Sequence, residues 1–223
     1  MFSLKPVFFF AAKILIFYLL LIALFTWWGA SYTKTLNKVN AFVFENYGSN
    51  GLIRFKINKP KKTPFSIKME MISKKMARQV QRQANKSNNR KKQGGVKMLF
   101  YQFDAWLFAV LPLIIVLSFI LASPIPPLQM LKALGLGIFF SQLLVLFKIG
   151  IIITDEVYIN TWLQIDDSLW QTIFANHSAT TALKDIFKYV GFSLIFSVLI
   201  WASAAFNRKD WRRFSRIIDK MGG

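Results

Sequence analysis

The sequence predicts an all-α integral membrane protein with four transmembrane helices and a small polar α/β region between the first and the second. Three observations support this class. Only 17% of the 223 residues are charged and 54% are hydrophobic, whereas soluble domains carry about 25% charged residues. The apolar residues gather in long runs, and the charges lie in the connections between them. Because about 20 apolar helical residues cross a hydrocarbon core of ~30 Å, we expect these runs to lie in a membrane.

Residues 1–30 are expected to form the first transmembrane helix, a signal anchor whose span covers 7–28. The apolar run is longer than the ~7–15 residues of a signal peptide. Trp27 and Trp28 end it, as aromatic residues do at a membrane interface. The small residues at 29–31 resemble a cleavage site, so removal of this segment stays open as an alternative.

Residues 31–103 form a basic polar connection. Residues 42–44 and the alternating run 52–57 flank turn formers, which predicts either a small hairpin or one strand after a short helix. From Ser66 onward, apolar residues at helical spacing predict a basic amphipathic helix, through Met69, Ile72, Met76 and Val80. Between Arg54 and Lys97 there are fifteen basic residues and one acid. We expect such a charged stretch to be solvated and partly disordered.

Residues 104–154 are predicted to form a transmembrane hairpin. The first apolar run, 105–122, contains no charge, and the second, 131–153, is interrupted only by two lysines. The proline-rich segment 123–127 between them favours a tight turn. Both runs are therefore long enough to cross a bilayer.

Residues 155–185 form an acidic loop, with five of the ten acids of the chain and one lysine. Within it, 157–174 suits an interfacial helix, because two adjacent aspartates at mid-depth would make a full span costly. Residues 186–206 are predicted to form the fourth transmembrane helix, with small residues that allow close helix packing. Residues 207–223 are predicted to form a basic amphipathic tail on the membrane surface.

Four spans would place both termini on one side and the basic connection and acidic loop together on the other, where we expect them to attract each other. The tail carries six basic and two acidic residues, which predicts a cytoplasmic C-terminus in a bacterial inner membrane. The basic connection favours the reverse threading, but positive charge counts for little in loops beyond ~60 residues. The reverse orientation therefore stays open.

Five groups of residues have a chemical reading, and each also has a simpler one. A general base needs an arranged partner, so His177 is expected to be a solvated loop residue. The acidic pairs at 155–156 and 166–167 could bind a divalent cation through their oxygens, but their spacing matches no calcium-binding loop, so solvated acids are expected. Lys13 and Lys148 lie inside apolar runs, where lysines sometimes mark conduction paths, but each is near enough to an end to reach the interface.

The basic connection and its aromatic neighbours suggest single-stranded nucleic acid, but no recognition motif accompanies them, so nucleic acid is not expected as a partner. Gly135 and Gly137 lie within a span, which favours helix packing over a phosphate loop. The absence of cysteine excludes disulfides and thiolate chemistry. The sequence thus predicts no catalytic, cofactor-binding or metal-ligating residue and no cofactor. The expected partners are the lipid bilayer, anionic lipid headgroups and another membrane protein.

The hairpin carries a resemblance to a known family. Leu111-Pro112-Leu113 is followed by Leu121-Ala122-Ser123-Pro124, a short turn and Leu134-Gly135-Leu136-Gly137. These residues, with the order of one span, a polar region, a hairpin and a last span, resemble the exosortase H-associated membrane proteins. Those are small inner-membrane partners of a transpeptidase-like protein-sorting enzyme in Gram-negative bacteria. The resemblance implies an accessory role beside an exosortase, whose catalytic residues would lie on the partner.

We therefore expect a non-enzymatic accessory or scaffold subunit of an inner-membrane assembly, with an exosortase-like enzyme as its partner. A small transporter, a channel or a membrane-perturbing effector is the alternative, supported only by the in-span lysines and the small-residue helix faces. An intramembrane enzyme is disfavoured, because the apolar runs hold no paired aspartates, no Ser–His arrangement and no set of metal ligands.

Overall fold

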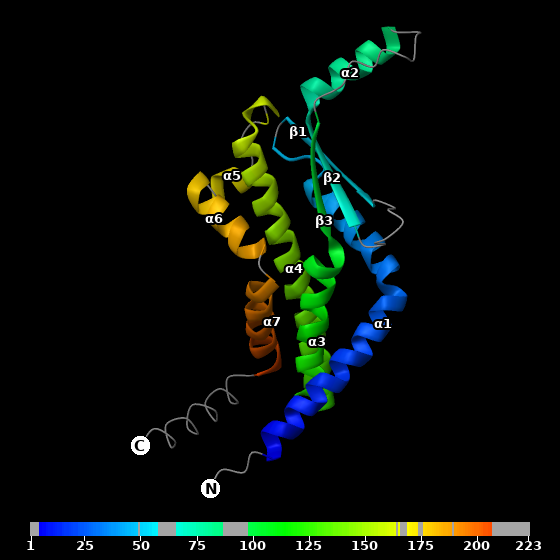
Figure 1. Ribbon diagram of the computed structural model, residues 1–223, viewed down its shortest axis with the longest axis vertical. Coiled ribbons are helices and arrows are strands. Elements are labelled where there is room, and N and C mark those ends of the chain that lie inside the picture. The colour runs from blue at the N-terminus through cyan, green and yellow to red at the C-terminus, as the bar shows by residue number, and fades with distance from the viewer. Residues whose placement is uncertain are drawn as a thin grey trace. The chain divides into compact units, whose positions relative to one another are not determined.

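A computed structural model describes residues 5–48, 50–57, 66–86, 98–163, 165, 169–173, 176–188 and 190–206. These residues are mostly helical and include one three-stranded sheet (Figure 1). They form two compact units. Unit 1 comprises the described parts of Met1–Trp27, Leu107–Val145 and Tyr189–Gly223, and unit 2 comprises those of Trp28–Trp106 and Leu146–Lys188.

The first helix, α1 (Lys5–Phe44), runs unbroken for 40 residues. It extends far beyond the predicted span at 7–28 and includes residues 42–44, so the structure has one strand after a helix rather than the alternative hairpin. In its polar half, the hydroxyl of Thr33 donates to the carbonyl oxygen of Gly29 at 2.8 Å. The chain then turns at Gly48, whose φ of 63° lies in the left-handed region that glycine adopts without strain.

Two helices, α1 and α4 (Pro127–Ile159), are long and apolar enough to cross a membrane. The prediction of four spans is thus supported for two helices among the described residues. In the predicted hairpin at 104–154, a π-helical turn η1 (Trp106–Val110) leads into α3 (Leu111–Ala122), which has 12 residues. Pro112 has no amide hydrogen for the carbonyl four residues earlier, which accounts for the π-helical turn. The predicted span at 186–206 is divided, and its larger part is α7 (Val190–Ala205), with 16 residues.

Unit 1 is held together by apolar contacts and a few polar bonds. Val116, Ile120 and Ala133 form a buried cluster of α3 and α4. The fully buried hydroxyl of Ser197 in α7 lies 3.2 Å from the carbonyl oxygen of Pro112 and 2.9 Å from that of Ser193, and can donate to either. This contact shows one of the small residues of α7 packed against α3, as their composition predicts.

The proline-rich turn is tied to the end of α7. Trp201 Nε1 donates to Ser123 Oγ at 2.8 Å, and Gln129 Nε2 donates to the carbonyl oxygen of Ala205 at 2.8 Å. The Ser123 hydroxyl in turn donates to the carbonyl oxygen of Phe119 at 2.7 Å. The turn is therefore anchored by side chains as well as by its prolines.

Unit 2 contains the sheet, in the order β1 (Gly51–Ile57), β2 (Ser66–Ser73) and β3 (Leu99–Asp104), with both pairs antiparallel. In β2, the side chains of Ile67, Met69 and Met71 are fully buried on one face. The other face carries Glu70, whose Oε2 lies 2.7 Å from Lys56 Nζ of β1. This alternation of buried and charged residues is that of a half-buried strand.

The prediction of a helix from Ser66 onward is wrong for its first half, because residues 66–73 form β2 and only α2 (Lys74–Lys86) is helical. The apolar residues of 67–72 fit both helical spacing and a period of two. Pairing with a strand on each side selects the strand, and such pairing overrides local pattern.

The predicted acidic loop at 155–185 is mostly helical. Its first residues continue α4 to Ile159, and η2 (Thr161–Leu163), α5 (Leu169–Ile173) and α6 (His177–Lys188) follow. The prediction of one interfacial helix over 157–174 is therefore wrong. The predicted aspartate pair at 166–167 and the amphipathic tail at 207–223 lie outside the described residues.

Candidate functional site

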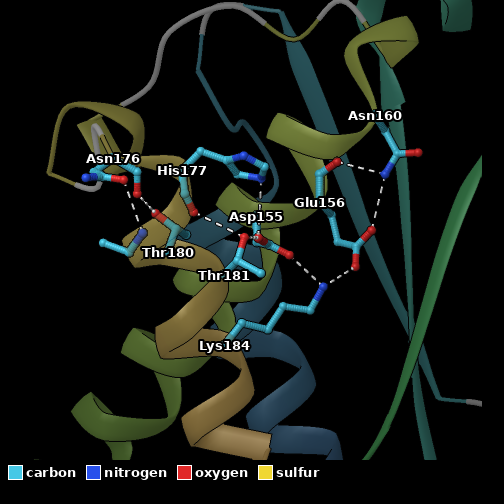
Figure 2. A network of polar contacts seen from close by, with 9 residues as sticks. Asp155, Glu156, Asn160, Asn176, His177, Thr180, Thr181 and Lys184 are labelled. Atoms are coloured by element: carbon cyan, nitrogen blue, oxygen red, sulfur yellow. Dashed lines mark hydrogen bonds and ion pairs between the residues drawn. The ribbon is translucent and has the colours of Figure 1, made fainter.

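The most concentrated polar chemistry in the described part of the chain lies between the end of α4 and α6 (Figure 2). Asp155 is fully buried although it carries a carboxylate. Lys184 of α6 places Nζ 2.7 Å from Oδ2 of Asp155 and 2.7 Å from Oε1 of Glu156. One lysine therefore bridges two consecutive carboxylates from the neighbouring helix.

Further hydrogen bonds fix both carboxylates in place. The hydroxyl of Thr181 donates to Oδ1 of Asp155 at 2.6 Å. Asn160 Nδ2 donates to Oε2 of Glu156 at 3.2 Å. These groups approach from α6 and from the end of α4, and Figure 2 shows them converging on the carboxylates. A buried carboxylate is tolerated when it is paired with a cation and hydrogen-bonded. Asp155 has both, through Lys184 and Thr181.

The start of α6 is positioned by Asn176. Its Oδ1 accepts the amide hydrogen of Ala179 at 3.2 Å, which is an N-cap hydrogen bond. Its carbonyl oxygen accepts the hydroxyl of Thr180 at 2.9 Å. This cap begins the helix at His177, so that Thr181 and Lys184 follow on the face toward Asp155 (Figure 2).

The electrostatics favour a charged Lys184. Burial alone lowers the pKa of Lys184, but the hydrogen bonds to Asp155 and Glu156 outweigh burial, and the net pKa is raised. Tyr101 of β3 has its ring centroid 6.0 Å from Lys184 Nζ. Burial raises the pKa of the Tyr101 phenol, opposed by the charge of Lys184. Lys184 is therefore charged at neutral pH.

His177 is the residue with the clearest catalytic reading, and its geometry does not support one. Its Nε2 lies 3.8 Å from Oδ1 of Asp155, beyond hydrogen-bond distance. The nearby hydroxyl of Thr181 donates to Asp155 and lies 3.1 Å from the carbonyl oxygen of His177, not against its ring. A hydroxyl nucleophile needs a base that accepts its proton, and the Thr181 hydroxyl makes no such contact with the His177 ring. The side chain of His177 is also half exposed.

The other candidate residues of the sequence are scattered. No three histidine, aspartate or glutamate side chains among the described residues come together to hold a metal ion. Lys13 is exposed, with Nζ 4.8 Å from the ring centroid of Phe9. Lys148 is 1% exposed, with Nζ 5.9 Å from the ring centroid of Phe187 in unit 2. The prediction that Lys148 extends to the membrane interface is therefore wrong, because it is packed inside the protein.

Gly135 and Gly137 of α4 have different surroundings. A Cβ on Gly137 would lie 2.7 Å from Cδ1 of Ile120 and 3.0 Å from Cγ1 of Val116 in α3. A Cβ on Gly135 would meet nothing within 4 Å. Close helix packing therefore explains Gly137 and does not explain Gly135.

Sequence reasoning missed two features of unit 2. The hydroxyls of Tyr47 and Thr154 are hydrogen-bonded at 2.7 Å and join the end of α1 to α4. Asn40 of α1 is fully buried, yet its side-chain nitrogen and oxygen have no hydrogen-bond partner among the described residues. The sequence offers no local signal for the first, because Tyr47 and Thr154 are 107 residues apart.

Comparison with models of protein families, with curated proteins and with solved structures finds no match.

Proposed function

We propose that this chain is a non-enzymatic accessory or scaffold subunit of a bacterial inner-membrane assembly, with an exosortase-type sorting enzyme as its partner. The observation that carries the proposal is the continuity of α1. This helix of 40 residues begins with an apolar segment long enough to cross a membrane, and its last residues belong to unit 2. There, Asn37 donates to the carbonyl oxygen of Phe55 at 3.3 Å, so the helix is bonded to the sheet. A folded module carried on such a helix suits presentation to a partner.

The charged cluster supports a structural role. Lys184, Thr181 and Asn160 direct their donor atoms at Asp155 and Glu156. Groups that satisfy one another in this way position helices, whereas catalytic groups direct a proton donor or acceptor at a substrate. The resemblance of the hairpin residues to the exosortase-associated family supplies the identity of the partner.

We further propose four membrane crossings and a cytoplasmic C-terminus. Besides α1 and α4, the described residues include two shorter apolar segments, at Trp106–Ala122 and in α7. At 1.5 Å per residue they extend about 25 Å, which a slightly thinned bilayer or flanking aromatic residues accommodate. A reporter fused after Gly223 is then expected on the cytoplasmic side, and one inserted at residues 87–97 on the other side. Both reporters on the same side would overturn this threading.

The partner is tested by co-purification. The tagged full chain is expressed with the exosortase from the same membrane, solubilised in mild detergent and isolated through its tag. We expect retention of the exosortase well above that seen with an unrelated tagged polytopic protein. Equal retention with both tagged proteins would overturn the proposed partnership.

A transport assay discriminates the competing class. Liposomes that contain the chain are expected to pass protons and small ions no faster than protein-free liposomes. Flux that rises with the amount of protein would favour a transporter or channel and would overturn the scaffold role.

A further inference from the structure

Exposed positive charge gathers on α2, where Lys75, Arg78 and Arg82 are exposed. A groove of about 400 Å³ is lined by residues of this helix and of the turn before β1, namely Asn50, Lys74, Lys75, Arg78, Gln79 and Arg82. Every lining side chain offers hydrogen-bond donors, and four of the six are cationic. Arg78 and Arg82 are exposed, and within the described part of the chain neither forms a salt bridge.

We infer that this α2 groove is a docking site for an acidic segment of a partner protein. The spacing of the charges supports the choice of a polypeptide. Lys74, Arg78 and Arg82 recur every four residues, which is a rise of about 6 Å along the helix. Carboxylates on alternate residues of an extended strand are ~6.6 Å apart. Each arginine fork then meets one carboxylate in the two-pronged geometry that guanidinium groups favour.

The groove also lies far from the headgroups of the protein's own bilayer. This statement rests on the proposed membrane span, which ends at Trp28. Lys74 begins α2 with its amide hydrogen on the carbonyl oxygen of Asn50, at 2.7 Å, just beyond the end of α1. The part of α1 from Trp28 to Phe44 rises about 24 Å, and still about 18 Å at a steep tilt of about 40°. This exceeds the Debye length of ~8 Å at physiological salt.

The direction of α2 and the composition of the groove agree with this choice. Figure 1 shows α2 continuing beyond the end of the sheet instead of folding back along it. The six lining residues include no aromatic ring, so they offer no platform on which nucleic-acid bases stack. Contact with an acidic polypeptide is therefore favoured over contact with lipid or nucleic acid.

The test measures binding to the full chain in nanodiscs of uncharged lipid. The probe is a labelled peptide of alternating Glu and Ser, and its control has Gln in place of Glu. The double variant Arg78→Gln, Arg82→Gln is compared with Lys34→Gln, Lys38→Gln. Both pairs are exposed, stand four residues apart on a helix and lose two charges. Glutamine is a good helix former, so both variants are expected to fold.

We expect the wild type to bind the Glu peptide and not the Gln peptide, with affinity that falls as salt rises. The α2 variant should bind the Glu peptide at least about fivefold more weakly, because it loses two exposed charge pairs with the peptide. The α1 variant should bind as the wild type does. Equal loss in both variants, or none in either, would overturn the site. Tighter binding of a single-stranded oligonucleotide or of anionic vesicles, with the same dependence on Arg78 and Arg82, would overturn the choice of partner.

One further outcome concerns the chain itself. A Cβ on Gly51, next to the groove, would lie 3.1 Å from Ile165, and two aspartates follow Ile165 in the sequence. If Asp166→Asn with Asp167→Asn bound the Glu peptide much more tightly than the wild type, the protein's own acids would be the occupant and the inference would fall. Peptide binding requires no exosortase, so its failure and the failure of co-purification are separate results.

Discussion

Lys184 Nζ lies 2.7 Å from Oδ2 of Asp155, a carboxylate with no exposure to solvent. The pair joins α6 to the last turns of α4. Removal of one member of a buried ion pair leaves a charge without compensation, which costs far more than removal of a surface charge. This relationship yields two predictions about stability.

The first prediction is that Lys184→Met lowers the free energy of unfolding in detergent by roughly 3 kcal/mol, because Asp155 loses its cation. The matched control is Lys38→Met, which removes an exposed lysine of α1 and should change stability by less than about 0.5 kcal/mol. Chemical unfolding followed by tryptophan fluorescence measures both. Equal effects of the two substitutions would show that the pair contributes no special stability.

The second prediction concerns alkaline pH. Since the folded-state pKa of Lys184 is raised, its contribution to stability is complete below the unfolded-state pKa of about 10.4 and is lost as the pH rises through the folded value. The difference in unfolding free energy between wild type and Lys184→Met should therefore be constant near neutral pH and shrink above about pH 10. Tyr101 is present in both proteins, so its ionisation contributes to both curves. A difference that already shrinks near neutral pH would show that the charge of Lys184 does not account for the stabilisation.

The third prediction separates the two glycines of α4. Gly137→Leu should destabilise the packing of α3 on α4 by roughly 1–3 kcal/mol, because even the first added carbon contacts Ile120 and Val116. Gly135→Leu, two residues away in open space, should have little effect. Apparent melting temperatures in the same detergent measure the contrast. If both variants melt together with the wild type, α3 and α4 do not pack as described.

The fourth prediction has the opposite sign. Asn40→Leu should raise the free energy of unfolding by about 1–2 kcal/mol, since it removes a buried amide that forms no hydrogen bond. Asn37→Leu is the comparison on the same helix. The side-chain oxygen of Asn37 is also buried without a partner among the described residues, but its nitrogen donates to the carbonyl oxygen of Phe55, so loss of this bond should make Asn37→Leu less favourable than Asn40→Leu. Destabilisation by Asn40→Leu would mean that Asn40 has a polar partner in the folded protein.

Local sequence accounts for much of the helical structure. The uncharged run 105–122 and the proline-rich turn after it predict a helix that ends near Ala122, and α3 ends there. The apolar run that ends at Trp28 predicts a helix long enough for a membrane, and α1 contains it. These features depend on composition and on neighbours within a few turns, which the sequence states directly.

The candidate site depends on contacts between distant residues. Asp155 and Lys184 are 29 residues apart, and the sequence suggested that the acids lie in a solvated loop. Only the packing of α6 on α4 brings lysine and carboxylate together, and burial then gives the pair its strength. The strand at 66–73 has the same origin, because partners on both sides outweighed a helical pattern.

The sequence by itself determined that this chain has long apolar helices and a strongly basic polar region, because hydropathy and charge are properties of the residues themselves. Tertiary structure alone decided which lysine is buried, which glycine is needed and which acids are paired. Those properties belong to distances between segments, and no local pattern along the chain encodes such distances.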